Sequence, residues 1–165
     1  RPDSMEVVID GSTEKVDVCN VIPAMKAGKI ADLAGVTDGN WSPVIPHSMQ
    51  SRKNDHIHIL GDASSQGDMP KSGFSANSQA KVCANAVRGA LTGSTVFPAK
   101  FSNTCWSLIA TNDGVKVGAT YEATAEKIAK VDGFVSKTGE TADVRQATYE
   151  ESEGWYSGIT SDMFG

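Results

Sequence analysis

Residues 56–93 read HIHILGDASSQGDMPKSGFSANSQAKVCANAVRGALTG, and the order of the elements in this stretch sets the expected fold. Ile57–Leu60 is a short apolar run before Gly61 and Asp62, which predicts a buried strand that ends where backbone and an acid approach a ligand. A helix that stops at Gly93 is predicted further along. Its apolar positions recur at spacings of three and four: Ala76, Ala80, Cys83, Val87 and Leu91.

The end of the strand and the start of the helix form a candidate ligand site. Gly61 has no side chain to block close approach, and the Asp62 carboxylate offers two acceptor oxygens for sugar hydroxyls. Ser72 or Ser75 is expected to cap the helix, whose unpaired N–H groups favour negative charge on a ligand. A Gly-Asp pair also ends many strands that bind nothing, so the prediction of a ligand site depends on the helix that follows.

Composition excludes several classes of function. The formal net charge of the 165 residues is -5, which disfavours nucleic acid and anionic membrane surfaces as partners. No apolar run is long enough to span a bilayer, and no signal peptide is found. A chain of this length is long enough to bury a core.

The remaining elements are predicted from turn formers and periodicity. Strands are expected at Val7–Asp10 and Val16–Val21, joined through Gly11 and Ser12, and at Thr104–Ala110 and Val115–Tyr121 around Asp113-Gly114. Gly39–Pro46 is expected to be a loop. Helices are expected near Lys29–Ala34, over Glu122–Val131, and more loosely over Thr148–Phe164 with interruptions at Gly154 and Gly158.

Four segments together resemble one family, the flavoprotein subunit of flavocytochrome c sulfide dehydrogenase. They follow each other in the family's order: VDVCNVIPAMKAGKIADLAG, GDASSQGDMPKSGFSANSQAK, FSNTCWSLIA and WYSGITSDMFG. This family lies within the FAD-dependent pyridine nucleotide-disulfide oxidoreductase class, whose members begin with a Gly-rich dinucleotide fingerprint. No such fingerprint occurs in this chain, so we expect it to correspond to the carboxyl-terminal portion of such a flavoprotein.

The resemblance implies an α/β fold: the last portion of a flavoprotein with two dinucleotide-binding domains, plus a small α+β carboxyl-terminal domain. Residues 1–55 would then end the second nucleotide-type domain, residues 56–95 would return to the FAD-binding domain, and residues 96–165 would form a carboxyl-terminal flavin-binding or interface domain. Such a piece leaves sheet edges open, and we expect the amino-terminal portion of the same flavoprotein to associate with it.

Cys105 carries the chemistry that the resemblance implies. In the family, the cysteine of the NTC motif forms a redox-active disulfide with a cysteine from the amino-terminal part, close to the flavin. Hydrosulfide attacks the disulfide, one sulfur becomes a persulfide, and the released thiolate delivers an electron pair to the flavin. The alternative is that Cys105 is a small buried residue of a strand. Strand alternation places Cys105 with Ser107 and Ile109, and Trp106 with Leu108 on the other face.

The resemblance also implies a set of FAD contacts. Trp155 would be an aromatic wall at the sulfide pocket, although Trp155 and Tyr156 are otherwise typical core or interface residues. Lys71 would place an ammonium near the pyrimidine edge of the flavin, with a solvated loop lysine as the alternative. Trp106 replaces the family's usual tyrosine, so no catalytic role is transferred to it. The expected cofactor-binding residues are Gly61, Asp62, Ala63, Lys71, Ser72, Gly73 and Phe74.

The other cysteines and the histidines carry weaker signals. Cys83 and Cys19 are expected to be small buried hydrophobes in a helix and a strand. His56 and His58 alternate on one expected strand, and His47 is the third imidazole, but metal sites need more ligands than this, so no metal is predicted.

Three functions follow as hypotheses. The first is oxidation of sulfide to sulfur or polysulfide by an FAD-dependent enzyme that passes electrons to a c-type cytochrome subunit in the periplasm. The second is a sulfide:quinone reductase-like flavoprotein, although the acidic tail with Glu150, Glu151 and Glu153 lacks the apolar face of a membrane anchor. The third is a non-catalytic interaction fragment without a cofactor.

Overall fold

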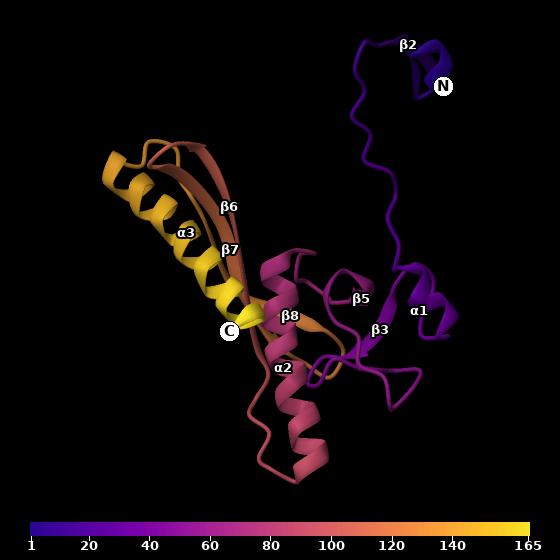
Figure 1. The fold of residues 1–165 in the computed structure, drawn as a ribbon, viewed down its shortest axis with the longest axis vertical. Helices are drawn as coiled ribbons and strands as arrows, with labels where there is room; N and C mark the ends of the chain where they lie inside the picture. The colour runs from indigo at the N-terminus through magenta and orange to yellow at the C-terminus, as the bar shows by residue number, and fades with distance from the viewer.

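The computed structural model describes residues 1–165 as a mixed α and β chain with three small sheets (Figure 1). The helices are α1 (Lys29–Leu33), α2 (Gly73–Thr92) and α3 (Ala142–Phe164), with 3-10 turns η1 (Pro2–Ser4) and η2 (Gly61–Ala63). The strands are β1 (Glu6–Ile9), β2 (Ser12–Lys15), β3 (Ser42–Ile45), β4 (Gln50–Ser51), β5 (Ser64–Ser65), β6 (Lys100–Ala110), β7 (Asp113–Ala123) and β8 (Ile128–Val135).

The largest sheet has the antiparallel order β6-β7-β8. The predicted hairpin between its first two strands is confirmed, and its strands are longer than expected. The turn lies just before the predicted Asp113-Gly114 step, because Asn112 adopts a left-handed φ of 59° and Asp113 already pairs with Ala110. Asparagine tolerates this conformation better than most residues, so it closes the turn.

The helix expected over Glu122–Val131 is wrong. Glu122 ends β7, a short turn follows, and Ile128 begins β8. The Thr124 hydroxyl accepts the N–H groups of Glu126 and Lys127 and so fixes the turn, while Ile128 is buried with 1% exposure. Burial of that side chain and pairing with β7 outweigh the local helical pattern.

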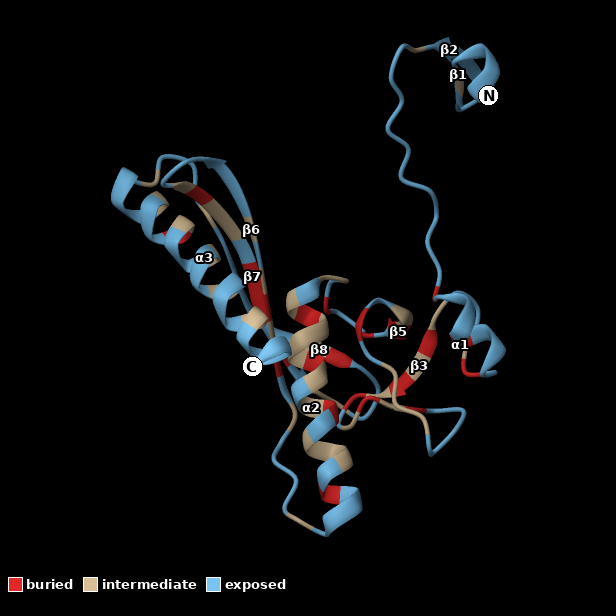
Figure 2. Cartoon of the chain, in the orientation of Figure 1, coloured by how far each residue is buried: buried red, intermediate tan, exposed pale blue.

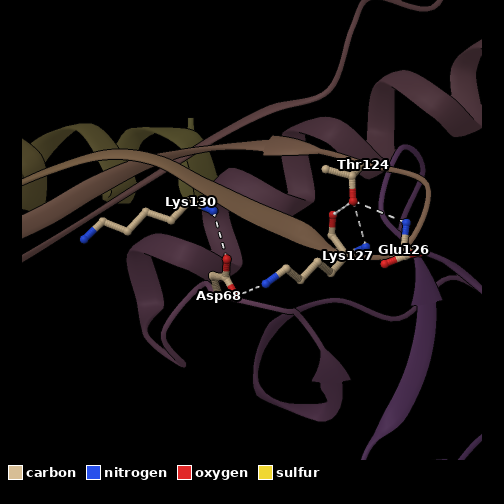
Figure 3. Close-up of polar contacts among 5 residues, drawn as sticks. All are labelled: Asp68, Thr124, Glu126, Lys127 and Lys130. Carbon is tan, nitrogen blue, oxygen red and sulfur yellow. Dashed lines mark hydrogen bonds and ion pairs between the residues drawn. The ribbon is translucent and has the colours of Figure 1, made fainter.

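The β7–β8 turn is held by residues far away in the sequence (Figure 3). Asp68 accepts from the Lys127 ammonium at 2.7 Å and from the Lys130 backbone N–H at 3.1 Å, and its own N–H donates to the Ile128 carbonyl at 2.9 Å. We call Asp68, Thr124, Lys127 and Lys130 the turn clamp. It joins the loop before α2 to the sheet that follows α2.

Helix α3 covers one face of the β6-β7-β8 sheet (Figure 1). It starts earlier than predicted and runs without the expected interruptions at Gly154 and Gly158. Glycine costs about 1 kcal/mol per helical position relative to alanine, and packing and ion pairs along the sheet outweigh that cost. Among these contacts, Arg145 pairs with Asp113 at 2.5 Å and Lys116 pairs with Glu151.

Helix α2 confirms its prediction closely. Ser72 caps it by accepting the Ser75 N–H at 3.1 Å, and Gly93 ends it with a left-handed φ of 68°. Cys83 is buried on its inner face, but Leu91 at the far end is 81% exposed because the neighbouring elements end before it. Figure 2 shows all buried residues in red. The main core among them comprises Val44, Met49, Met69, Cys83, Phe101, Ala119, Tyr121 and Ile128.

The region before η2 departs from several expectations. Gly39–Pro46 is not all loop, since it contains β3, which pairs with β4 and β5. Ile57–Leu60 is not a buried strand: His58 makes one bridge to Gln50, and the run is half-buried or exposed. The Ile59 N–H donates to the Met49 carbonyl, so the segment follows the β3–β4 hairpin without forming a ladder of its own.

The amino-terminal hairpin stands at the end of an extended segment, away from the rest of the chain (Figure 1). The helix near Lys29 is confirmed as α1, but the strand expected at Val16–Val21 is wrong. Asp10 and Gly11 form a tight turn with positive φ. Ile9 therefore pairs with Ser12, and the partner strand β2 ends at Lys15. Cys19 therefore lies outside any strand and is exposed, which corrects its expected burial.

Candidate functional site

An open cavity of ≈ 830 Å³ lies where the start of α2, the middle of β6 and the second half of α3 meet. Ser72, Gly73 and Phe74 reach it from α2, Cys105 and Trp106 from β6, and Trp155 from α3. We call it the aromatic cavity. Its volume lies within the usual range of sites for small molecules and cofactors, about 300–1,000 Å³.

Three aromatic rings form one wall of this cavity. Phe74 and Trp155 stack with centroids 5.7 Å apart and an interplanar angle of 8°. Trp106 lies 5.6 Å from Trp155 and 6.0 Å from Phe74, in tilted geometry. Each ring comes from a different element, so the cluster ties α2, β6 and α3 together while presenting aromatic surface to the cavity.

Trp106 also contributes a polar group without a partner. Its indole N–H is buried and donates no hydrogen bond. A buried donor without an acceptor costs about 1–3 kcal/mol, so this N–H lowers the stability of the aromatic cluster.

Cys105 lies at the edge of the cavity as an exposed, free thiol. The structure therefore contradicts the alternative in which Cys105 is a small buried residue of a strand. Its sulfur is 3.5 Å from the Nδ2 atom of Asn103, two residues back on the same face of β6. An exposed thiol is accessible for thiol–disulfide exchange.

Asn103 connects the thiol to the start of α2. Its carbonyl oxygen accepts from the Ser72 hydroxyl at 2.5 Å and from the Ser75 hydroxyl at 3.2 Å. Asn103 and Ser75 are both buried. The cap of α2 and the sulfur on β6 thus belong to one hydrogen-bonded network, which pattern reasoning along the sequence did not find.

The start of α2 gives the cavity an electropositive rim. The first backbone N–H groups of a helix have no partner inside it, and the helix dipole places partial positive charge there. Gly73 and Phe74 occupy these positions at the cavity edge. An anionic or electron-rich edge of a bound ring would be stabilised there.

Gly61, Asp62, Ala63 and Lys71 do not line the aromatic cavity; they gather beside it, around η2. Gly61 is buried with φ 70°, and its N–H donates to the Gln79 side-chain oxygen at 2.7 Å. A Cβ atom there would already touch the Cβ of Ala76 at 3.4 Å, so the glycine permits close packing of η2 on α2. The Asp62 residue is exposed.

Lys71 is partly exposed, but its ammonium is held by neighbouring groups. Its ammonium donates to the carbonyls of Asp62 at 2.6 Å and Ser64 at 2.9 Å, and it lies 3.8 Å from the centroid of the Trp41 ring. Desolvation lowers the pKa of this ammonium, and the Asp62 carboxylate opposes that shift. Lys71 therefore fixes the turn that carries Asp62.

A buried glutamine pair, which the sequence pattern did not predict, supports the same turn. The Gln79 amide donates to the Gln66 side-chain oxygen at 2.8 Å, and the Gln66 amide donates to the Pro70 carbonyl at 2.6 Å. Gln79 falls one residue before Ala80 of the predicted apolar stripe. A glutamine on the inner side of an amphipathic helix is the one signal that would have indicated this contact.

The remaining reactive residues lie elsewhere. Burial raises the pKa of the Cys83 thiol in the core, as expected of a small buried hydrophobe. No group of three or more histidine, cysteine, aspartate or glutamate side chains is placed to hold a metal ion. None of the helices combines the length and apolar character needed to cross a membrane.

Comparison with known protein families identifies the part of the chain that builds most of this cavity. Residues 98–164 match the family described as flavocytochrome c sulphide dehydrogenase, flavin-binding. This segment is thus a flavin-binding domain of an oxidoreductase. The match covers the carboxyl-terminal portion of the chain, and it is to the family that the resemblance indicated. Cys105, Trp106 and Trp155 lie inside the matched segment, whereas Ser72, Gly73 and Phe74 precede it.

Proposed function

We propose that this chain forms one side of the FAD site of a sulfide dehydrogenase that oxidises sulfide to sulfur or polysulfide and passes the electrons to a c-type cytochrome subunit in the periplasm. The observation that carries the proposal is the position of Cys105. It is an accessible thiol at the rim of an aromatic cavity, inside a segment that matches a flavin-binding family.

The residues around the cavity fit a flavin. Aromatic walls pack against a planar ring, and the start of α2 supplies hydrogen-bond donors. Asp62 and Ala63 on η2 would bind sugar or ribitol hydroxyls. Gly61 and Lys71 hold that turn in place. When bound, FAD accepts an electron pair and passes electrons on singly.

Cys105 handles the sulfur in this proposal. Its disulfide partner is a cysteine from the amino-terminal portion of the same flavoprotein. Hydrosulfide forms a new S–S bond to one of the two sulfurs, the old S–S bond breaks, and the other sulfur leaves as a thiolate that carries the electron pair. Trp155 and Phe74 line the same cavity as that sulfur.

The direct test uses the complete flavoprotein with Cys105→Ser. We expect the variant to keep its flavin and to lose rapid bleaching of the flavin absorbance when sulfide is mixed in anaerobically, by at least about 100-fold in rate. Cys19→Ser is the matched control, since Cys19 is exposed but far along the chain from the cavity residues, and it should react like the parent. A Cys105→Ser variant that reacts at the parent rate would contradict the proposal.

The electron acceptor separates this proposal from a quinone-reducing flavoprotein. After reduction by sulfide, the parent protein is expected to be reoxidised faster by its c-type cytochrome than by a short-chain quinone, as followed by haem and flavin absorbance. Faster reoxidation by the quinone would favour the sulfide:quinone reductase-like flavoprotein. A purified complete protein that retains no flavin would favour a non-catalytic interaction module.

A further inference from the structure

We propose that Asn103 is a positioning residue for the sulfur of Cys105, which it holds by an amide N–H donor and stabilises when the sulfur carries negative charge. The inference deepens the proposed function, because it assumes that Cys105 is the reactive sulfur. It stands on the network that joins the start of α2 to β6.

The orientation of the Asn103 amide is set from both sides. Ser72 Oγ accepts the Ser75 backbone N–H at 3.1 Å, which leaves its hydroxyl proton to donate to Asn103 Oδ1 at 2.5 Å. The Ser75 hydroxyl donates to the same oxygen at 3.2 Å. With its oxygen engaged by two hydroxyls, the amide presents its NH2 group to Cys105, with Nδ2 and Sγ 3.5 Å apart.

Burial makes this arrangement rigid. Asn103 is only 3% exposed and Ser75 is fully buried, so neither side chain is free to exchange its partners for water. The NH2 group of an amide only donates, and a thiolate only accepts, so the pair is complementary in the charged state. Hydrogen bonds to ionised groups are the stronger kind.

The chemical consequence concerns the step that opens the disulfide. When hydrosulfide bonds to the partner sulfur, the S–S bond breaks and its electron pair stays on Cys105 as a thiolate. The Asn103 amide stabilises that leaving sulfur without changing the balance of the reaction. The residue acts through Cys105 and does not itself exchange electrons or protons.

Alkylation of the reduced complete flavoprotein with iodoacetamide tests the inference, because only the thiolate reacts quickly. Peptide mass spectrometry gives the rate at Cys105 relative to the exposed Cys19 of the same molecules, and protection of the buried Cys83 reports the fold. Asn103→Asp keeps an oxygen for Ser72 and Ser75 but replaces the donor that faces the sulfur. Ser107→Ala is the control, since Ser107 lies on the same face of β6 as Cys105 and makes no hydrogen bond with the sulfur.

For Asn103→Asp we expect the Cys105 to Cys19 rate ratio at neutral pH to fall by at least about tenfold, because the carboxylate removes the hydrogen bond to the sulfur and adds a negative charge beside it. The deficit should shrink at alkaline pH, where thiols ionise without help. A role in packing alone would not produce that pH profile. Ser107→Ala should leave the ratio unchanged.

Should Asn103→Asp expose Cys83, the deciding variant is Ser75→Ala, which removes one of the two donors on the amide oxygen and keeps the Ser72 cap. Its expected ratio is about two- to threefold below the parent. An unchanged ratio in a folded variant overturns the role of Asn103. Since neither flavin nor sulfide enters this assay, that outcome leaves the proposed function to be judged by Cys105→Ser alone.

Discussion

The turn clamp and the aromatic cavity both join segments that are distant in the sequence, and they differ in how fully their polar groups are paired. In the turn clamp, both carboxylate oxygens of Asp68 have donors, from Lys127 and Lys130. In the aromatic cavity, the Trp106 N–H has no acceptor and the Cys105 thiol is exposed. Paired groups hold a fold together, whereas an exposed thiol at an open cavity is available to a ligand.

The contrast makes separable predictions. Substitutions in the turn clamp should change the free energy of unfolding and leave flavin binding and sulfur chemistry of the folded protein unchanged. Substitutions in the cavity should change flavin binding or sulfur chemistry more than stability.

The largest loss of stability is expected for Gly67→Ala, next to the clamp. Gly67 has φ +64°, and a Cβ atom there would lie 2.4 Å from the Ile128 carbonyl oxygen and 2.9 Å from its nitrogen. The variant combines left-handed strain with a backbone clash that displaces the Asp68–Ile128 hydrogen bond. We expect a cost of about 3 kcal/mol in the free energy of unfolding, measured by urea denaturation.

Gly139→Ala is the matched control for that experiment. Gly139 has a similar φ of +83°, but no atom lies within 4 Å of the position of its Cβ. Only the conformational strain should remain, about 1 kcal/mol. Equal losses for the two variants would show that the contact of Gly67 with β8 contributes nothing.

A smaller loss of stability is expected for Trp155→Ala, together with a loss of flavin. The variant removes the stacked contact with Phe74 and the tilted contact with Trp106, which predicts about 1–3 kcal/mol. The complete flavoprotein should also retain less FAD after purification, as read from the ratio of flavin to protein absorbance. Tyr156→Ala, at a neighbouring residue that is 66% exposed, should change stability by no more than about 0.5 kcal/mol. Full flavin content in Trp155→Ala would remove the aromatic wall from the proposed site.

The smallest effect is expected for Asp68→Asn, and it depends on pH. The Lys127 ammonium, followed by the Lys130 N–H, holds the pKa of the Asp68 carboxyl below its usual value. This group therefore adds stability above the ordinary pKa of an aspartate, and that contribution is lost as the pH falls through the lower pKa of the folded state.

The thermal midpoint of Asp68→Asn should accordingly lie below the parent's at neutral pH and converge with it in acid. Asp55→Asn is the control, because the Asp55 side chain is exposed and makes no hydrogen bond or ion pair. Parallel curves for Asp68→Asn and the parent across the acid range would contradict the contribution of the ionised clamp.

The sequence predicted α2 well because independent signals agree there: a capping serine, an apolar stripe and a terminal glycine. It failed at β8, where Ile128 is placed by pairing with β7 and by burial in a core built from distant residues. Local periodicity does not contain that information. The strand expected at Ile57–Leu60 failed for a related reason, since its apolar residues pack beside the β3–β4 hairpin without a ladder.

For the site, the motif around Cys105 and the aromatic at Trp155 were found through the family resemblance, and the structure places both at one cavity. Asn103 was missed because its partners Ser72 and Ser75 lie 31 and 28 residues away. Trp106 was set aside because it departs from the family's tyrosine, yet it supplies the unpaired donor of the wall. Contacts of this kind are made only when β6 packs against α2.

The central claim is that Cys105 is the sulfur that reacts with sulfide at a flavin. Peptide mapping of the complete oxidised flavoprotein under non-reducing conditions tests it most directly. We expect a disulfide-linked peptide that contains Cys105 and a cysteine from the amino-terminal portion, and its disappearance after anaerobic addition of sulfide. A free Cys105 thiol in the oxidised, active protein would contradict the claim.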